Sequence, residues 1–351
     1  MGDKSKSPYG ASPKWVIMRF LENGPSIPDD LLNARDEGRV VFFCGAGVSQ
    51  ARAELPDFYG LLDRVLRDLR APVDCVAQRA YRASKGVGDQ YKIPNLISAD
   101  RIFGLLQRDF DSRTVESAVA HALRSGRTEA DFSAHEILLR LARTDRGHVQ
   151  LVTTNFDRLF ERVAAPLKAH VPPRLPDVSH DGELDGVVYL HGRVDEEYSR
   201  ADGDGLVLTT ADFGHAYLSD GWATRFIREI VEKHVVVFIG YSASDPPIQY
   251  FLEGLKKSQN MAGRLYAFQA TESERDVAAW TEKGVTAIPH ESAGDHASLW
   301  QTLEEWALRA DDPARWRNGV LQQSMAGPRT LASHVRGQAA AHQVRVSYIG
   351  R

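Results

Sequence analysis

The sequence predicts an α/β fold in which a Rossmann-like parallel sheet is covered by helices. Two observations carry this prediction. Four short runs have interiors built mostly from Val, Ile, Leu, Phe and Tyr with little alternation, which is typical of strands buried on both faces. Each run ends in a cluster of small or polar residues, and ligands bind at the carboxyl ends of the strands in open α/β sheets. The four runs are residues 39–44, 149–154, 187–190 and 234–239.

The composition is that of an ordinary globular protein and excludes several classes. The chain has 351 residues, of which 43% are hydrophobic and 26% charged, so we exclude a disordered chain and a disulfide scaffold. Its net charge of −4 gives no global basic field, and we expect no direct binding to nucleic acid. The two cysteines, Cys44 and Cys75, form no CxxC pair, which excludes a four-cysteine zinc site.

Neither a secretion signal nor a membrane span is expected. Residues 1–14 are polar and lack the apolar core of a signal peptide. The longest apolar runs are far shorter than the ~20 residues that cross a bilayer. We therefore expect a cytoplasmic protein that makes no contact with membranes.

The spacing of the strands predicts the domain organisation. Residues 1–30 are expected to form an N-terminal arm, residues 31–310 the α/β domain, and residues 311–351 a C-terminal tail or linker. About a hundred residues separate the first two strands, whereas a crossover needs only a dozen or more. We therefore expect a helical insertion at about residues 58–146 that covers the pocket, the alternative being several crossover helices on one face. Within it, residues 83–95 contain two Gly and a Pro and are predicted as a loop.

Further elements follow from weaker patterns. Strands are predicted at residues 206–209, 264–268 and 285–289, and helices at residues 222–233, 247–256 and 295–309.

The cluster Gly-Ala-Gly-Val-Ser at residues 45–49 follows the first strand and precedes a helical pattern. Glycines there let backbone N–H groups approach a phosphate, and a helix N-terminus favours negative charge. The dinucleotide fingerprint GxGxxG is not met, because Gln50 stands where the third glycine belongs. A phosphate site and a plain tight turn both remain open for this cluster.

The other three clusters carry side chains suited to proton transfer and hydrogen bonding. After the second strand, Asn155 could hold a sugar hydroxyl or water and Asp157 could orient it, or both could simply cap the next helix. After the third strand, His191 could exchange a proton near neutral pH, or be a packed residue. After the fourth strand, residues 240–245 carry serines that could bind phosphate or ribose, or cap a helix.

Other catalytic signatures are missing from the sequence. There is no GxxxxGK[ST] loop, no HExxH helix and no GxSxG elbow. The twelve His show no spacing that would support a metal, and we expect none.

Taken together and in order, the four clusters resemble the motifs of the sirtuin family. They read Gly-Ala-Gly-Val-Ser at 45–49, Thr-Thr-Asn-Phe-Asp at 153–157, Leu-His-Gly at 190–192 and Gly-Tyr-Ser-Ala-Ser-Asp at 240–245. The resemblance covers about residues 39–290 and implies a Rossmann-like sheet that binds NAD, with a smaller helical module over the pocket.

The resemblance also points to one branch of that family. Sirtuin deacylases usually hold a four-cysteine zinc ribbon after the His-Gly motif, and this chain has no cysteine beyond Cys75. It is therefore similar to the zinc-free bacterial branch that acts as the toxic effector of antiphage abortive-infection systems. That resemblance implies an NAD glycohydrolase, which releases nicotinamide and ADP-ribose with NAD as substrate and no metal.

The resemblance assigns a role to individual residues. Asn155 would position the ribose or the attacking water, and His191 would be the general base. The remaining residues would bind NAD: Gly45, Ala46, Gly47 and Ser49 around the diphosphate, Gly240 and Ser242 towards the adenosine, Asp157 near the nicotinamide or holding Asn155, and Asp245 elsewhere on the cofactor.

Two other functions use the same cofactor and stay open at this point. One is an NAD-dependent protein deacylase or ADP-ribosyltransferase, and the other is a non-enzymatic sensor of NAD or ADP-ribose. A toxic NADase has to be held off until it is triggered. The resemblance therefore implies a homo-oligomer, and an activating partner such as a HerA-like ATPase or a sensor domain.

Overall fold

The structure is a computed structural model of the chain, and it describes residues 17–93, 95–124, 131–178, 184–243, 245–255, 263–271 and 274–325. The outer parts of the predicted arm and tail, residues 1–16 and 326–351, lie outside the described residues, as does Ser244 of the fourth cluster.

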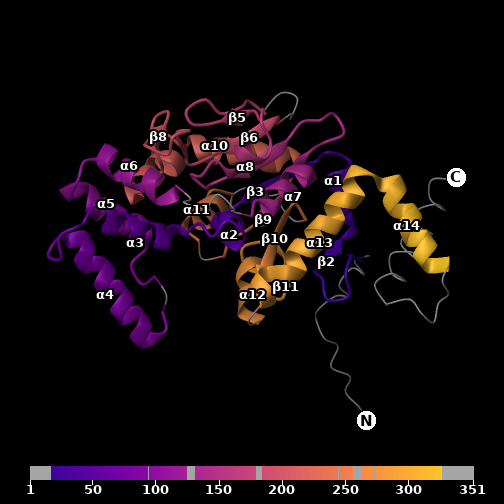
Figure 1. The fold of residues 1–351 in the computed structure, drawn as a ribbon, viewed down its shortest axis with the longest axis horizontal. Coiled ribbons are helices and arrows are strands. Elements are labelled where there is room, and N and C mark those ends of the chain that lie inside the picture. Colours follow the sequence, from indigo (N-terminus) through magenta and orange to yellow (C-terminus); the bar gives the residue numbers. More distant parts are fainter. Residues whose placement is uncertain are drawn as a thin grey trace, which may run out of the picture.

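A seven-stranded sheet runs through the molecule in the order β11-β10-β9-β3-β4-β6-β5, and every neighbouring pair is parallel (Figure 1). This confirms the predicted fold class. The four strands predicted most strongly are the adjacent strands β9, β3, β4 and β6, so their carboxyl ends share one edge. The strands are β3 (Val40–Cys44), β4 (Gln150–Thr153), β5 (Ala169–His170), β6 (Gly186–Tyr189), β9 (Val235–Ile239), β10 (Leu265–Ala270) and β11 (Thr286–His290).

Helices cover both faces of this sheet. In β3, Phe42 belongs to the apolar core on one face, and Val41 and Phe43 belong to the core on the other. This is the two-sided burial that a strand without alternation predicts. The first core is closed by α1 (Asp29–Asp36), α7 (Ser133–Ala142) and α13 (Ala293–Asp311), and the second by α10 (Trp222–Lys233), α11 (Pro246–Leu255) and α12 (Glu274–Thr281).

Four helices form a separate module at one end of the molecule (Figure 1). They have their own apolar core, which includes Leu62, Phe103 and Val115, and this core continues to Phe156 just after β4. We propose these helices as the inserted module over the pocket. The predicted insertion also included α7, but α7 packs on the sheet. The module consists of α3 (Phe58–Asp68), α4 (Val76–Tyr91), α5 (Ala99–Asp109) and α6 (Ser112–Leu123).

The loop predicted at residues 83–95 is wrong for its first nine residues, because α4 continues to Tyr91. Packing against α5 outweighs the two glycines. Ser84 is fully buried and its Oγ accepts a hydrogen bond from the backbone N–H of Ile97 at 2.9 Å. The helix ends where Lys92 takes a left-handed conformation.

The described part of the predicted arm is folded onto the core. Strands β1 (Ile17–Arg19) and β2 (Ser26–Pro28) pair antiparallel, and Met18 and Ile27 are buried beside α1 and α13. The first residues of the predicted tail form α14 (Pro313–Met325), whose Trp316 ring contacts Phe20 edge-on. In these two segments, the described residues of the predicted arm and tail pack against the same apolar core.

The segment between β6 and β9 contains short elements that shape the sheet edge. These are β7 (Arg193–Val194), β8 (Ala201–Asp202), α9 (Thr210–Gly214) and the π-helical turn η1 (His215–Ser219), while α8 (Leu159–Val163) follows β4. The strand predicted at residues 206–209 is wrong. Its backbone N–H groups donate instead to His191, Glu116 and Asp212, so it joins no ladder.

Candidate functional site

A cavity of about 590 Å³ lies at the carboxyl edge of the sheet. Small-molecule sites are typically about 300–1,000 Å³. Its wall contains residues that follow β3, β4, β6 and β9, and Phe58 at the start of α3. Of the ten residues predicted for the site, nine line this cavity: Ala46, Gly47, Ser49, Asn155, Asp157, His191, Gly240, Ser242 and Asp245.

The tenth residue, Gly45, does not line the cavity. It allows the backbone after β3 to approach the backbone at Gly240 after β9. A Cβ atom at Gly45 would come within 2.5 Å of the carbonyl oxygen of Gly240. Gly240 has φ +74°, and a Cβ there would lie 2.6 Å from the backbone N of Val48. The first turn of α2 (Ala46–Ala51) therefore fits against β9 only because these positions lack side chains.

Two N–H groups of this loop are already engaged. The N–H of Gly45 donates to Ile239 and that of Gly47 donates to Gly240, at 2.9 and 3.0 Å. These glycines shape the cavity floor rather than presenting their own donors to a phosphate.

Asn155 is held by hydrogen bonds from its amide nitrogen. Nδ2 donates to the carbonyl of Gly45 and to Oγ of Ser49, both at 3.1 Å. Both N–H bonds of the carboxamide are thereby used, which leaves Oδ1 as its available polar atom. Ser49 Oγ donates in turn to Oδ2 of Asp157 at 2.8 Å.

A second histidine completes this network, and the sequence analysis missed it. His135 of α7 is fully buried, and its Nε2 lies 3.1 Å from Ser49 Oγ. Because the serine proton goes to Asp157, the imidazole must donate here. Burial lowers the pKa of His135, which keeps the ring neutral. The available signal was a histidine on the otherwise apolar buried face of a helix.

His191 sits in an apolar wall of the cavity. It is 2% exposed, and its ring meets Phe213 edge-on, with the planes at 88°. Burial lowers its pKa to about 3, so the imidazole is neutral at physiological pH. Its Nε2 lies 2.8 Å from the hydroxyl of Tyr217 in η1.

The register of the sheet places His191 beside Asn155. Thr153 of β4 pairs with Tyr189 of β6, and each site residue comes two positions after its paired residue. Both side chains line the same cavity. The strand order thus brings the polar residues that follow β4 and β6 to one cavity.

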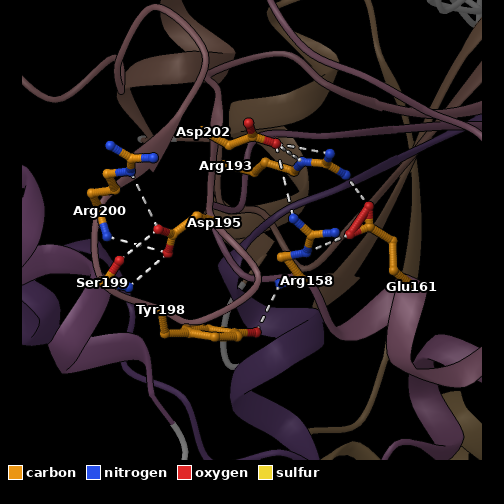
Figure 2. A network of polar contacts seen from close by, with 8 residues as sticks. All are labelled: Arg158, Glu161, Arg193, Asp195, Tyr198, Ser199, Arg200 and Asp202. Carbon is orange, nitrogen blue, oxygen red and sulfur yellow. Dashed lines mark hydrogen bonds and ion pairs between the residues drawn. The ribbon is translucent and has the colours of Figure 1, made fainter.

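The loops that follow β4 and β6 are tied together by an ion-pair network (Figure 2). Arg158 directly follows Asp157, and Arg193 comes two residues after His191. Both arginines pair with Glu161 of α8 and with Asp202 of β8. The Tyr198 hydroxyl accepts the backbone N–H of Arg158 at 3.0 Å, which fixes the β7–β8 hairpin on the same loop.

The loop after β9 carries a carboxyl group with a perturbed pKa. Burial, with the neighbouring charge of Asp57, raises the pKa of Asp245 to about 6. One carboxylate oxygen of Asp245 accepts the backbone N–H of Ser242 at 2.7 Å. Tyr241 in this loop donates to the carbonyl of Cys44 at 3.0 Å, which joins β9 to the end of β3.

The far end of the cavity is formed by residues that the sequence analysis did not select. They are Gln269 of β10, His290 of β11, and His296 and Trp300 of α13. Burial lowers the pKa of His290 to about 4. Nδ1 of His296 and Nε1 of Trp300 are buried without a hydrogen-bond partner among the described residues, so a bound ligand could satisfy them.

The described lining contains three acidic residues, Asp57, Asp157 and Asp245, and neither Lys nor Arg. A phosphate bound here would rely on hydroxyl, ring and backbone N–H donors. Within the described ranges, we find no group of three or more His, Cys, Asp or Glu side chains arranged to hold a metal ion. In the same part of the chain, none of the helices has both the length and the apolar character to cross a membrane.

Fold and site together define an α/β protein with a ligand cavity at the carboxyl edge of a parallel sheet. Residues 149–288 match the family model described as SIR2-like domain. The chain therefore carries a sirtuin-like domain.

Two curated relatives match most of this chain. It is 31% identical over 326 residues to the uncharacterized protein y4cA of Sinorhizobium fredii (strain NBRC 101917 / NGR234), covering 89% of this chain and 26% of that protein. It is 21% identical over 263 residues to defense-associated sirtuin 2 of Bacillus subtilis, covering 73% of this chain and 23% of that protein. The chain thus spans about a quarter of the length of these relatives.

Solved structures give more distant matches. A crystal structure of a Sir2 homologue in complex with NAD is 17% identical, with a TM-score of 0.42 over 83% of this chain and 96% of that chain. A complex of a mutant Sir2 homologue with ADP-ribose is 15% identical, with a TM-score of 0.39 over 82% and 98%.

Proposed function

We propose that this protein hydrolyses NAD to nicotinamide and ADP-ribose. One observation carries the proposal: within a sirtuin-like domain, the Asn155 carboxamide and the His191 imidazole leave neighbouring strands in register and line one cavity. A domain that only binds a nucleotide does not need a neutral base beside a fixed carboxamide.

The proposed chemistry is displacement of nicotinamide by water. The bond between ribose and nicotinamide breaks, its electron pair goes to the pyridinium nitrogen, and water forms the new bond to the ribose carbon. Neutral His191 accepts the proton that water loses. Positioned acid–base assistance of this kind typically contributes about 10²–10⁴-fold in rate.

Asn155 fits the task of holding that water. Its amide nitrogen is fully engaged by Gly45 and Ser49, so Oδ1 is the atom left to accept a hydrogen bond from water or a ribose hydroxyl. Ser49 and Asp157 then support Asn155 from behind. We thus propose them as positioning residues, together with His135.

The rest of the cavity suits a dinucleotide. The unpartnered ring nitrogens of His296 and Trp300 lie at its far end, and Ser242 and Asp245 lie beside Gly240 at its edge. We propose that the diphosphate and adenosine occupy this part, lying against Ala46 and Gly47 and held by the loop after β9. With neither Lys nor Arg in the described lining, NAD binding should depend only weakly on salt.

Nicotinamide release from NAD by the purified protein tests the proposal. We expect Asn155→Ala and His191→Ala to lower the rate by about 10²–10⁴-fold while NAD still binds. His121→Ala is the matched control, because His121 lies in α6 with its side chain 53% exposed, and it should behave as wild type.

Other outcomes would identify a different function. Nicotinamide release that requires an acetylated peptide, with the acetyl group transferred to the ADP-ribose, would indicate a deacylase. Label transfer from NAD to protein would indicate an ADP-ribosyltransferase. Tight NAD binding without any turnover would indicate a sensor.

We further propose that the activity serves antiphage defence, since defense-associated sirtuin 2 is among the relatives. Cells that express the wild type with its trigger should lose NAD, and cells with His191→Ala should keep it. A homo-oligomer and an activating partner, such as a HerA-like ATPase or a sensor domain, remain part of this proposal. Sedimentation of the purified protein, alone and with the candidate partner, tests both.

A further inference from the structure

Tyr217 reaches His191 from an unusual element. It lies in η1, a π-helical turn between α9 and α10. Such turns are rare in proteins as a whole, but many of those known lie at functional sites. The hydroxyl of Tyr217 is 2.8 Å from Nε2 of His191, and the two residues are 5% and 2% exposed. Among the described residues, Tyr217 is the side chain that forms a hydrogen bond with the His191 ring.

The Tyr217 ring is fixed on several sides. It stacks on Phe213 and on Tyr250 of α11, with interplanar angles of 24° and 29°. Its backbone carbonyl accepts Oγ1 of Thr224 at 2.7 Å, which ties η1 to the first turn of α10. The hydroxyl is therefore held in place before any ligand binds.

The two ring nitrogens of His191 face different surroundings. His191 lines the cavity, whereas Tyr217 lies outside the described lining. A hydrogen bond from Nε2 to Tyr217 thus turns that nitrogen towards the protein and leaves Nδ1 for the cavity. Which nitrogen of a histidine carries the proton is set by the hydrogen bond that the other one makes.

We propose that Tyr217 is a positioning residue for His191, holding Nε2 so that Nδ1 is the nitrogen that accepts the proton of the attacking water. This inference rests on the proposed NAD hydrolysis. In the step, the water proton moves to Nδ1, the remaining O–H becomes the new hydroxyl of ADP-ribose, and Nε2 keeps its proton and donates to the Tyr217 oxygen. The phenol stabilises the charged ring without taking a proton itself.

Tyr217→Phe removes only the hydroxyl and tests the role directly. We expect kcat for nicotinamide release to fall about tenfold, the scale of one lost hydrogen bond, with KM changed less than twofold. Tyr250→Phe is the matched control, because Tyr250 belongs to the same aromatic stack and makes no recorded contact with His191, and its kinetics should match wild type. In a His191→Ala background, Tyr217→Phe should have no further effect.

A second measurement does not depend on turnover. In ¹⁵N-histidine-labelled protein, the His191 signals are those absent from His191→Ala, and they should show the Nε2-protonated tautomer in wild type and a mixture of tautomers in Tyr217→Phe. An unchanged kcat in Tyr217→Phe, or a proton on Nδ1 in wild type, would overturn the inference. If wild type releases no nicotinamide, NAD hydrolysis itself fails, and the tautomer alone then decides whether Tyr217 orients His191.

Discussion

Single residues at the cavity could be predicted from the sequence only where they follow the end of a predicted strand. Asn155, Asp157 and His191 stand directly after predicted strands, and the sheet edge brings them together. His135 was missed because it lies in the first turn of α7 and does not follow a strand, and its link to Ser49 spans 86 residues. The far end of the cavity was missed for the same reason, since Trp300 sits inside an amphipathic helix without a motif.

The raised pKa of Asp245 predicts a pH-dependent stability. Its folded-state pKa of about 6 exceeds the usual 3.8, so folding favours the protonated form, and its stabilisation is lost as the pH rises through 6. Asp245→Asn keeps an acceptor for Ser242 and cannot ionise. We therefore expect it to be more stable than wild type at pH 8, by up to about 3 kcal/mol, with a difference that vanishes near pH 4.

Urea unfolding at a series of pH values measures this difference. Asp220→Asn, at an exposed carboxylate, is the control and should differ from wild type by the same amount at every pH. A constant difference for Asp245→Asn as well would show that Asp245 titrates normally in the folded protein.

At the scale of elements, the sequence predicted the buried strands and the amphipathic helices better than the loops. Residues 235–239 are apolar throughout and form β9, because a strand buried on both faces needs nothing else. Residues 83–91 carry glycines that suggest a loop, yet tertiary contacts of Tyr81 and Ser84 keep them in α4. The hairpin of β7 and β8 is fixed by ion pairs between distant segments (Figure 2). Such long-range pairs cannot be predicted from a local sequence pattern.

Two glycines test whether backbone approach or general flexibility matters. Gly240→Ala places a Cβ 2.6 Å from the backbone of Val48 at φ +74° and should lower the free energy of unfolding by about 2–4 kcal/mol. Gly86→Ala, within α4 and with nothing within 4 Å of the new Cβ, should raise it by about 0.5–1 kcal/mol. Chemical denaturation measures both, and equal effects would refute the role given to the contact between α2 and β9.

At the scale of the whole molecule, the predicted α/β sheet is confirmed, whereas the packing of the described end segments could not be predicted. The sheet follows from runs of apolar residues that can be seen one at a time. The folding of β1, β2 and α14 onto the core depends on partners at the other end of the chain, such as Phe20 with Trp316. Sequence patterns do not report contacts of that kind.

One partly buried ion pair joins α1 to α13, near the two ends of the fold. Arg309 of α13 is 4% exposed and donates to both carboxylate oxygens of Asp36 in α1, at 3.0 and 2.6 Å. Asp36→Asn leaves this buried guanidinium without its counter-charge and should lower the free energy of unfolding by about 2–4 kcal/mol. Thermal and urea unfolding at low salt measure the loss.

The neighbouring pair supplies the control. Glu37 pairs with Arg39, and their side chains are 58% and 49% exposed. Glu37→Gln should cost less than about 1 kcal/mol, because solvent screens such a pair. Equal losses for the two variants would mean that the pair of Asp36 and Arg309 does not join the ends of the fold.

The close contact of Gly45 and Gly47 with Gly240 has a consequence for how the protein is made. These segments lie almost two hundred positions apart, so a growing chain on the ribosome has no closed pocket until translation has passed residue 240 and that segment has emerged. A chain truncated before that point would contain Asn155 and His191 and still have no floor beneath them. Under the proposed NAD hydrolysis, synthesis in this order would protect the cell's own dinucleotide pool from unfinished copies.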